Sequence, residues 1–214
     1  MAFVKSNVEE YTRTFRTFLD AKDAFENNDE IEEVRFDALN YILGHQEISY
    51  VLDILLSKYS NQDNLDHPLI DHPLIDHAFS SFTTKPKRAE DYDNIFKMLQ
   101  SSNAYLRNKA ITFLQEYGET AKPFISKLLH NEDKDIRIFA VNILGDVNYE
   151  DSRDMLLELI EDEKNINVIM TAVDYLGEIG ELEDIEELLL LKEKFSQEPY
   201  VAFGIDLACE KIKG

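Results

Sequence analysis

Three of the five histidines in the chain lie in the stretch LDHPLIDHPLIDHAF, residues 65–79, and each of them follows an aspartate. Imidazole and carboxylate groups bind metal ions and exchange protons near neutral pH, which suggests a metal site or a proton sensor. The histidines, His67, His72 and His77, are five residues apart. That spacing turns successive side chains by about 140° on an α-helix and places them on opposite faces of a strand. In neither structure do they converge on one ion.

The Asp-His-Pro pattern is also typical of the start of a helix. Aspartate can cap the N-terminus, and proline is tolerated in the first turn because its missing N–H would be unpaired there anyway. We therefore predict that Asp71 starts a helix with Leu74, Ala78 and Phe82 on one face. The earlier copy, residues 66–70, lengthens the connection before this helix.

Other patterns that would support catalysis are missing from the sequence. It has no His-Glu dipeptide, the nearest match being GHQE at residues 44–47, and it has no nucleophile elbow, Gly-rich phosphate loop or Cys/His cluster. Acidic runs such as EDE and ELEDIEE are typical of solvated helix faces. The single cysteine, Cys209, is expected to be a packing residue. We expect no enzyme activity, no metal and no cofactor.

The charge of the chain favours one class of partner. There are 43 acidic and 22 basic residues, which give a net charge of -21 spread along the sequence. Such a surface repels nucleic acid and anionic membranes, so we expect neither as a partner and favour a protein with a basic surface. Solubility alone is the alternative explanation. A lone cysteine, and the lack of an apolar leader or spanning segment, predict a cytoplasmic protein.

An internal repeat organises the sequence. The segments VRFDALNYILG, LRNKAITFLQ, IRIFAVNILG and VIMTAVDYLG align without gaps on a central alanine. A step of 32 residues back from Ala110, and another of 32 forward from Ala172, gives two further units. The aligned small residues are Ala38, Ala78, Ala110, Ala140, Ala172 and Gly204. The next column is apolar in every unit: Leu39, Phe79, Ile111, Val141, Val173 and Ile205. The apolar columns share one face at a period of 3.6, which predicts an amphipathic helix in each unit.

A second apolar segment follows each of the first five helices after a turn. These segments are ISYVLDILLSKY, YDNIFKMLQ, AKPFISKLL, SRDMLLELI and DIEELLLLKEKF. The repeating unit is therefore predicted to be a helical hairpin. The small residue in each first helix lets a neighbouring helix approach closely.

The units DKDIRIFAVNILGDV, residues 133–147, and NINVIMTAVDYLGEI, residues 165–179, resemble the HEAT-like repeat family. The resemblance is to the short bacterial variety that is also named after the phycobilisome lyases, and it covers residues 34–213. Arg35, Arg107 and Arg137 occupy the basic position of that family. Ile75, Ile169 and Val201 replace it in the other units, so the resemblance implies an incomplete ladder of arginine contacts.

The predicted fold is all-α, an α-α superhelix of about six helical hairpins in a single domain. Residues 1–30 are expected to form an N-terminal capping helix and residues 31–214 the solenoid. The apolar stripe of the capping helix consists of Val8, Tyr11, Phe15, Phe18, Leu19 and Phe25.

Stacked hairpins present an extended surface, which suits binding of another protein better than enclosing a small substrate. We therefore predict a non-catalytic scaffold or adaptor. The candidate partner-binding residues are polar positions of the second helices: Lys127, Asp154, Glu158, Glu186 and Glu187. Two alternatives stay open. They are an acidic inhibitor or immunity protein of a basic enzyme, and a lyase or chaperone-like factor for a tetrapyrrole-binding protein.

The metal hypothesis gives a direct test. It would involve Asp66, His67, Asp71, His72 and His77. We expect calorimetric titration with zinc to show no submicromolar binding, because the spacing keeps the imidazoles apart. Submicromolar binding that disappears in the His67→Ala/His72→Ala double variant would establish a metal site instead.

Overall fold

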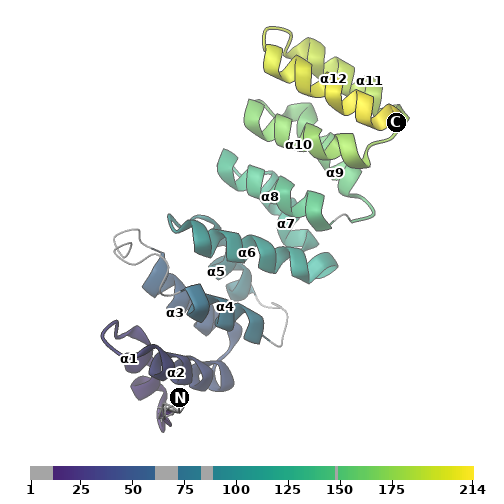
Figure 1. The fold of residues 1–214 in the computed structure, drawn as a ribbon. Coiled ribbons are helices and arrows are strands. Elements are labelled where there is room, and N and C mark those ends of the chain that lie inside the picture. Colours follow the sequence, from purple (N-terminus) through teal and green to yellow (C-terminus); the bar gives the residue numbers. More distant parts are fainter. Residues whose placement is uncertain (1–11, 61–71, 83–88, 148) are drawn as a thin grey trace, which may run out of the picture. The chain divides into compact units, whose positions relative to one another are not determined.

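The computed structural model describes residues 12–60, 72–82, 89–147 and 149–214. In these residues the chain forms twelve α-helices, short 3₁₀ helices and no strand (Figure 1). Close contacts divide the chain into two compact units, Met1–Lys109 and Ala110–Gly214, and the boundary falls within one helix, α6. The predicted all-α fold of helical hairpins is confirmed in each unit. The division into residues 1–30 and a single domain over residues 31–214 stays a prediction.

The first unit contains α1 to α5 and the beginning of α6. Their bounds are α1 (Phe18–Glu26), α2 (Glu32–His45), α3 (Ile48–Tyr59), α4 (His72–Ser81), α5 (Ala89–Leu99) and α6 (Ala104–Tyr117). Helix α2 packs against α1, α3 and α4, and α3 packs against α5. The first helices of the hairpins therefore contact one another, and so do the second helices.

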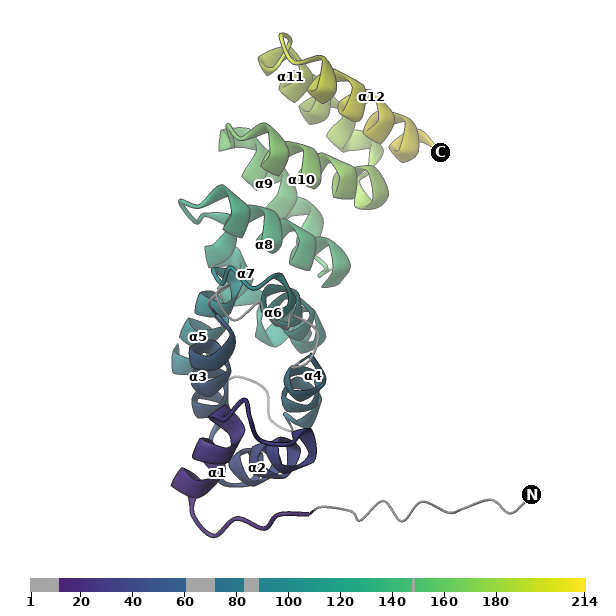
Figure 2. The same ribbon diagram turned by 60° about the vertical axis from the view of Figure 1, so that its left-hand side comes forward.

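The second unit repeats this arrangement in two layers (Figure 2). Its elements after α6 are η2 (Gly118–Thr120), α7 (Lys122–Leu129), α8 (Lys134–Val147), α9 (Ser152–Asp162), α10 (Ile166–Ile179), η3 (Leu182–Asp184), α11 (Ile185–Lys194) and α12 (Pro199–Lys213). Among the first helices α10 packs against both α8 and α12, and among the second helices α9 packs against α11. The layer that consists of the second helices α7, α9 and α11 carries the predicted partner-binding residues.

The column of small residues lies in the core, as the repeat predicts. The five alanines of the column are fully buried, and Gly204 is buried with them. The following column is less uniform, because Phe79 and Ile111 are only half-buried while the other four side chains are buried. The small column is therefore the stricter requirement of the fold.

Local signals in the sequence explain where individual helices begin. The Asn165 side chain caps α10 by accepting hydrogen bonds from the backbone N–H groups of Asn167 and Val168. Pro199 is the first residue of α12, where its missing donor is not needed. Gly118 ends α6 with φ = 52°, a conformation that side chains disfavour. Asn165 and Pro199 thus mark turns between hairpins, and Gly118 marks the turn within one.

The helix predicted from the DHPLI stretch is present as α4. Leu74 and Ala78 are fully buried, and Phe82 follows directly after the last helical residue. The Nε2 atom of His77 lies 2.6 Å from the Oδ1 atom of Asn40, and its ring contacts Phe36. His77 therefore joins two first helices. Residues 61–71, which include Asp66, His67 and Asp71, lie outside the described residues.

The predicted capping segment is helical over a shorter range than expected. Helix α1 begins at Phe18, packs against α2 and buries Ala21, Ala24 and Phe25. The prediction that Leu19 belongs to the apolar stripe is wrong, because its side chain is 65% exposed. Phe15 is buried although it precedes the helix, while Val8 and Tyr11 lie outside the described residues.

Two glycines give a test of how closely the first helices approach. A Cβ at Gly145 of α8 would overlap the ring of Tyr175 on α10, whereas a Cβ at Gly44 in the last turn of α2 meets no atom within 4 Å. Alanine in a helix is favoured over glycine by about 0.5–1 kcal/mol, so Gly44→Ala should stabilise the protein. Gly145→Ala should destabilise it by about 1–3 kcal/mol because the tyrosine ring must move.

Urea unfolding of both variants measures these effects. Both substitutions gain the same intrinsic helix preference, so their difference isolates the contact between α8 and α10. Equal stabilisation by the two alanines would contradict the close packing described here.

Candidate partner-binding surface

The five predicted partner-binding residues all lie on second helices of the second unit, and all are exposed. Lys127 lies on α7, Asp154 and Glu158 on α9, and Glu186 and Glu187 on α11. Their exposure follows from the helical period, because the opposite faces of these helices hold the buried residues. On α9 these include Leu156 and Ile160, and on α11 they are Leu188 and Leu191. That the five residues bind a partner stays a prediction.

The sequence reasoning missed three exposed leucines near the last two glutamates. Leu182 is 67% exposed, Leu189 46% and Leu190 59%. A signal for two of them is present in the sequence. Four consecutive leucines, residues 188–191, cannot all face the core of a helix with 3.6 residues per turn. The outer two are buried, and the inner two face solvent.

Two shallow hollows lie beside these leucines. One, of about 350 Å³, lies between α9 and α11 and includes Ile160, Glu161, Glu187 and Leu190. The other, of about 440 Å³, lies along η3 and α11 and includes Leu182, Glu186, Leu189 and Leu190. Leu190 borders both hollows. The structure thus brings Glu186 and Glu187 to one surface with exposed leucines, whereas Lys127, Asp154 and Glu158 line neither hollow.

A buried ion pair positions α11 on α9. The Arg153 guanidinium at the start of α9 donates to both oxygens of Asp184, at 2.7 Å from Nε and 2.5 Å from Nη2. Asp184 also accepts a hydrogen bond from the backbone N–H of Glu181, at the start of η3. Burial by itself would raise the pKa of the Asp184 carboxyl, but these hydrogen bonds hold the pKa below its usual value. The ion pair between Arg153 and Asp184 therefore holds the beginning of α11 to α9.

A similar contact joins α7 to the beginning of α9. Lys122 at the start of α7 lies 2.6 Å from Asp151, the residue before α9. The hydrogen bond from Lys122 lowers the pKa of the Asp151 carboxyl and outweighs the effect of its burial. Lys122 and Arg153 thus occupy corresponding places in successive second helices. This ladder of contacts lies in the layer that carries the candidate surface.

The arginine position in the first helices makes contacts that differ from unit to unit. Arg137 of α8 donates to both oxygens of Glu163, at 2.6 Å from Nε and 3.0 Å from Nη2. Arg107 of α6 donates to the backbone oxygen of Ser101, and Arg35 of α2 donates to the Tyr59 hydroxyl. The three arginines therefore make different contacts, and Arg137 pairs with the residue that directly follows α9, the second helix of its own hairpin.

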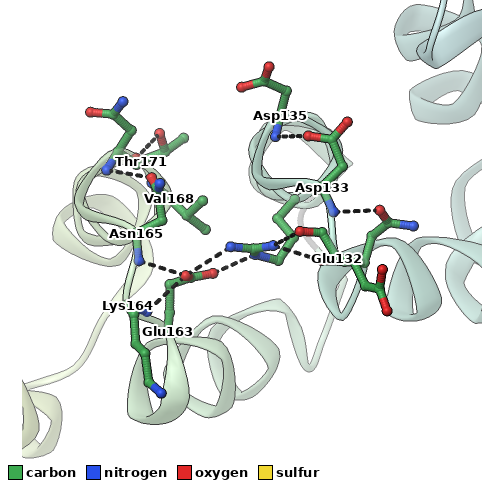
Figure 3. Close-up of polar contacts among 11 residues, drawn as sticks. Glu132, Asp133, Asp135, Glu163, Lys164, Asn165, Val168 and Thr171 are labelled. Atoms are coloured by element: carbon green, nitrogen blue, oxygen red, sulfur yellow. Dashed lines mark hydrogen bonds and ion pairs between the residues drawn. The ribbon is translucent and has the colours of Figure 1, made fainter.

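Glu163 connects this ion pair to the start of the next helix (Figure 3). Its Oε1 atom also accepts hydrogen bonds from the backbone N–H groups of Lys164 and Asn165. Asn165 in turn caps α10. Burial alone would raise the pKa of the Glu163 carboxyl, but the hydrogen bonds from Arg137, Asn165 and Lys164 lower it below its usual value. One carboxylate thus fixes the turn between α9 and α10.

Other features that bear on function are the reactivity of the cysteine, metal binding and membrane crossing in the described residues. Cys209 is buried in α12, and burial raises the pKa of its thiol, which disfavours the reactive thiolate. No group of three or more His, Cys, Asp or Glu residues in the described ranges could hold a metal ion. None of the described helices combines the length and apolar character needed to cross a bilayer.

Residues 121–198, which span α7 to α11, match the family model for HEAT repeats. This segment of the chain is similar to HEAT repeats. This confirms the predicted resemblance for the segment that carries the Lys122, Arg137 and Arg153 contacts. A comparison with curated proteins found no match. HEAT repeats are commonly scaffolds for protein interactions and are generally non-catalytic. The second helices α9 and α11 carry several exposed acidic residues.

The Glu163 contact predicts how the stability of the HEAT repeats depends on pH. The pKa of Glu163 is lower in the folded than in the unfolded protein, where it is about 4.3. Its contribution is therefore present above about pH 4.3 and is lost as pH falls through the folded pKa. Glu163→Gln should cost about 2 kcal/mol at pH 7, because Arg137 loses a charged partner. The cost should be smaller near pH 3, because the wild-type carboxyl begins to be protonated as pH falls below the unfolded value toward the folded pKa.

Urea unfolding at the two pH values measures this effect. Glu158→Gln is the matched control, because Glu158 is exposed and its loss should change stability little at either pH. A cost of Glu163→Gln that is the same at both pH values would contradict the electrostatic explanation.

Proposed function

We propose that this protein is a non-catalytic cytoplasmic scaffold that binds another protein with a basic surface through the exposed faces of α7, α9 and α11. The observation that carries the proposal is the charge of α9 and α11. Their exposed acidic residues are Asp154, Glu158, Glu161, Asp162, Glu186, Glu187 and Glu193. A surface of this charge attracts a basic partner and speeds its association.

The basic residues of the same two helices are engaged within the protein. Arg153 binds Asp184, the Nζ atom of Lys192 lies 2.5 Å from Asp206, and Lys194 donates to the backbone oxygen of Glu161 at 2.7 Å. Their positive charges are directed to internal contacts, while the carboxylates face solvent. This arrangement supports recognition of a basic protein.

Lys127 gives the proposed surface a direction. It is the one basic residue of the predicted set and lies on α7, whereas the acidic members lie on α9 and α11. A partner with a single acidic group at one end of its basic surface would bind in one orientation, because the reverse orientation places like charges together. Lys127 therefore contributes specificity more than affinity.

Affinity capture with matched charge variants tests the proposal. The tagged protein is compared with a surface variant and a control variant, each of which has lost the same number of acidic charges. The surface variant carries Asp154→Asn, Glu158→Gln, Glu186→Gln and Glu187→Gln. The control variant carries Asp135→Asn, Asp174→Asn, Glu178→Gln and Glu210→Gln, all of which are exposed positions on first helices.

We expect the wild-type protein and the control to retain a basic protein from cell extract at about 50 mM salt and to lose most of it at about 500 mM salt, because salt screens exposed charges. The surface variant should retain much less at either concentration. The retained protein, once purified, should bind the wild type in a calorimetric titration with the same order among variants. Equal retention by the surface variant and the control would refute a site on the second helices.

A further inference from the structure

The exposed leucines beside Glu186 and Glu187 form an apolar stripe with the spacing of a helix–helix contact. Leu182, Ile185 and Leu189 are spaced at i, i+3 and i+7, and Leu190 extends this stripe toward α9. Residues at these spacings lie on the same side of a helix and pack against the ridges of a second helix. Leu189 and Leu190 are about half exposed, and Leu182 is exposed further. An apolar stripe of this kind is uncovered in the second unit.

The stripe is bordered by acidic side chains on both sides. Glu183, Glu186 and Glu193 line the hollow along α11, while Glu161 and Glu187 line the hollow between α9 and α11. The one lysine that lines either hollow is Lys194, which donates to the backbone oxygen of Glu161. The surface therefore combines an apolar centre with a strongly acidic rim.

From this charge and shape we infer that the surface of α11 binds a basic amphipathic helix of the partner, with aliphatic side chains on one face and Lys or Arg beside them. The aliphatic side chains contact Leu182, Leu189 and Leu190, and one of them enters the hollow between α9 and α11. The basic side chains pair with Glu186, Glu187 and their neighbours. This inference rests on the function proposed above and names the part of the partner that is recognised.

The acidic rim disfavours the other occupants of an apolar stripe. A second copy of this chain would bring the glutamates of two rims together, and like charges in contact are unfavourable. Anionic membrane lipids are repelled for the same reason. A purely acidic or neutral helix would cover the leucines but leave the glutamates without partners. A basic amphipathic helix satisfies both the apolar centre and the rim.

Three labelled peptides of about 14 residues, long enough for about four helical turns, test the inference. The first places leucine on one face and lysine elsewhere, the second has serine in place of every leucine, and the third has glutamate in place of every lysine. Fluorescence anisotropy with the full-length protein at about 150 mM salt measures each dissociation constant. We expect the leucine/lysine peptide to bind at least about tenfold more tightly than either of the others.

Two leucine variants locate the binding. Leu190→Gln should weaken binding of the leucine/lysine peptide by about tenfold, as expected for the anchor of a small interface. Leu207→Gln is the matched control, since Leu207 is 42% exposed on α12 and lines neither hollow. It should change binding by less than about twofold. Both variants replace exposed side chains, and equal melting temperatures would show that folding is intact.

The outcomes separate this inference from the function proposed above. Equal binding of the serine/lysine and leucine/lysine peptides, unaffected by Leu190→Gln, would overturn the apolar anchor and leave a charge-based scaffold intact. If no lysine peptide binds, and if the surface variant captures as much partner as the control variant, both this inference and the proposed function are overturned. Self-association in sedimentation velocity that Leu190→Gln abolishes would identify a second copy as the occupant and overturn the inference. Leu190-dependent binding to phosphatidylcholine vesicles would overturn it in favour of a membrane surface.

Discussion

The close approach of neighbouring first helices is the constraint on which the second unit depends. Ala140, Ala172 and Gly204 are buried where α8, α10 and α12 pack together. At Gly177 a Cβ would lie 3.1 Å from the Cα of Ala208, which is tighter than ordinary packing. Larger side chains at these four positions would hold the first helices apart. They would also separate the second helices that are connected to them. The relative positions of α9 and α11, and hence the hollow between them, follow from residues in the opposite layer.

Charged groups add direction to this packing. Apolar burial holds helices together but allows them to slide, whereas a two-point contact between guanidinium and carboxylate is satisfied at one geometry. Arg153 fixes the start of α11 through Asp184, and Arg137 fixes the turn before α10 through Glu163. These carboxylates are largely buried and have depressed pKa values. These two buried carboxylates set helix positions, whereas many other acidic residues of the second unit are exposed, on first and second helices alike.

The exposed acidic residues explain why the chain can be strongly acidic and still fold. Repulsion among their carboxylates is weakened by water and salt, because these side chains lie on the surface. The same exposure makes them available to a partner. Leu189 and Leu190 of α11 are among the exposed apolar side chains of this surface, and their position among the glutamates gives a local site within a broadly acidic face. A short basic helix could use that site without contact to the rest of the protein.

The sequence by itself determined the helices and the repeat. The spacing of Ala110, Ala140 and Ala172 and the apolar columns around them is local information, and it correctly predicted six first helices and five second helices. The sequence also named Asp154, Glu158 and Glu187 as polar positions of second helices, and the structure shows that all three are exposed. The same reasoning placed Leu19 in an apolar stripe, where the structure leaves it exposed. A stripe predicts which residues share a face but not how much of that face a neighbouring helix covers.

Tertiary structure alone decided which charges meet and which leucines remain uncovered. Arg153 and Asp184 are 31 residues apart, and among the many acidic residues nearby the sequence does not single out this partner. The run of leucines at 188–191 contains a signal that some are exposed, which the sequence prediction did not use, and the hollow beside Leu190 exists only because α9 packs against α11. The physical reason is how far apart in the sequence the interacting residues lie. Helix formation depends on residues within one or two turns, whereas ion pairs and surface hollows depend on how separate helices pack.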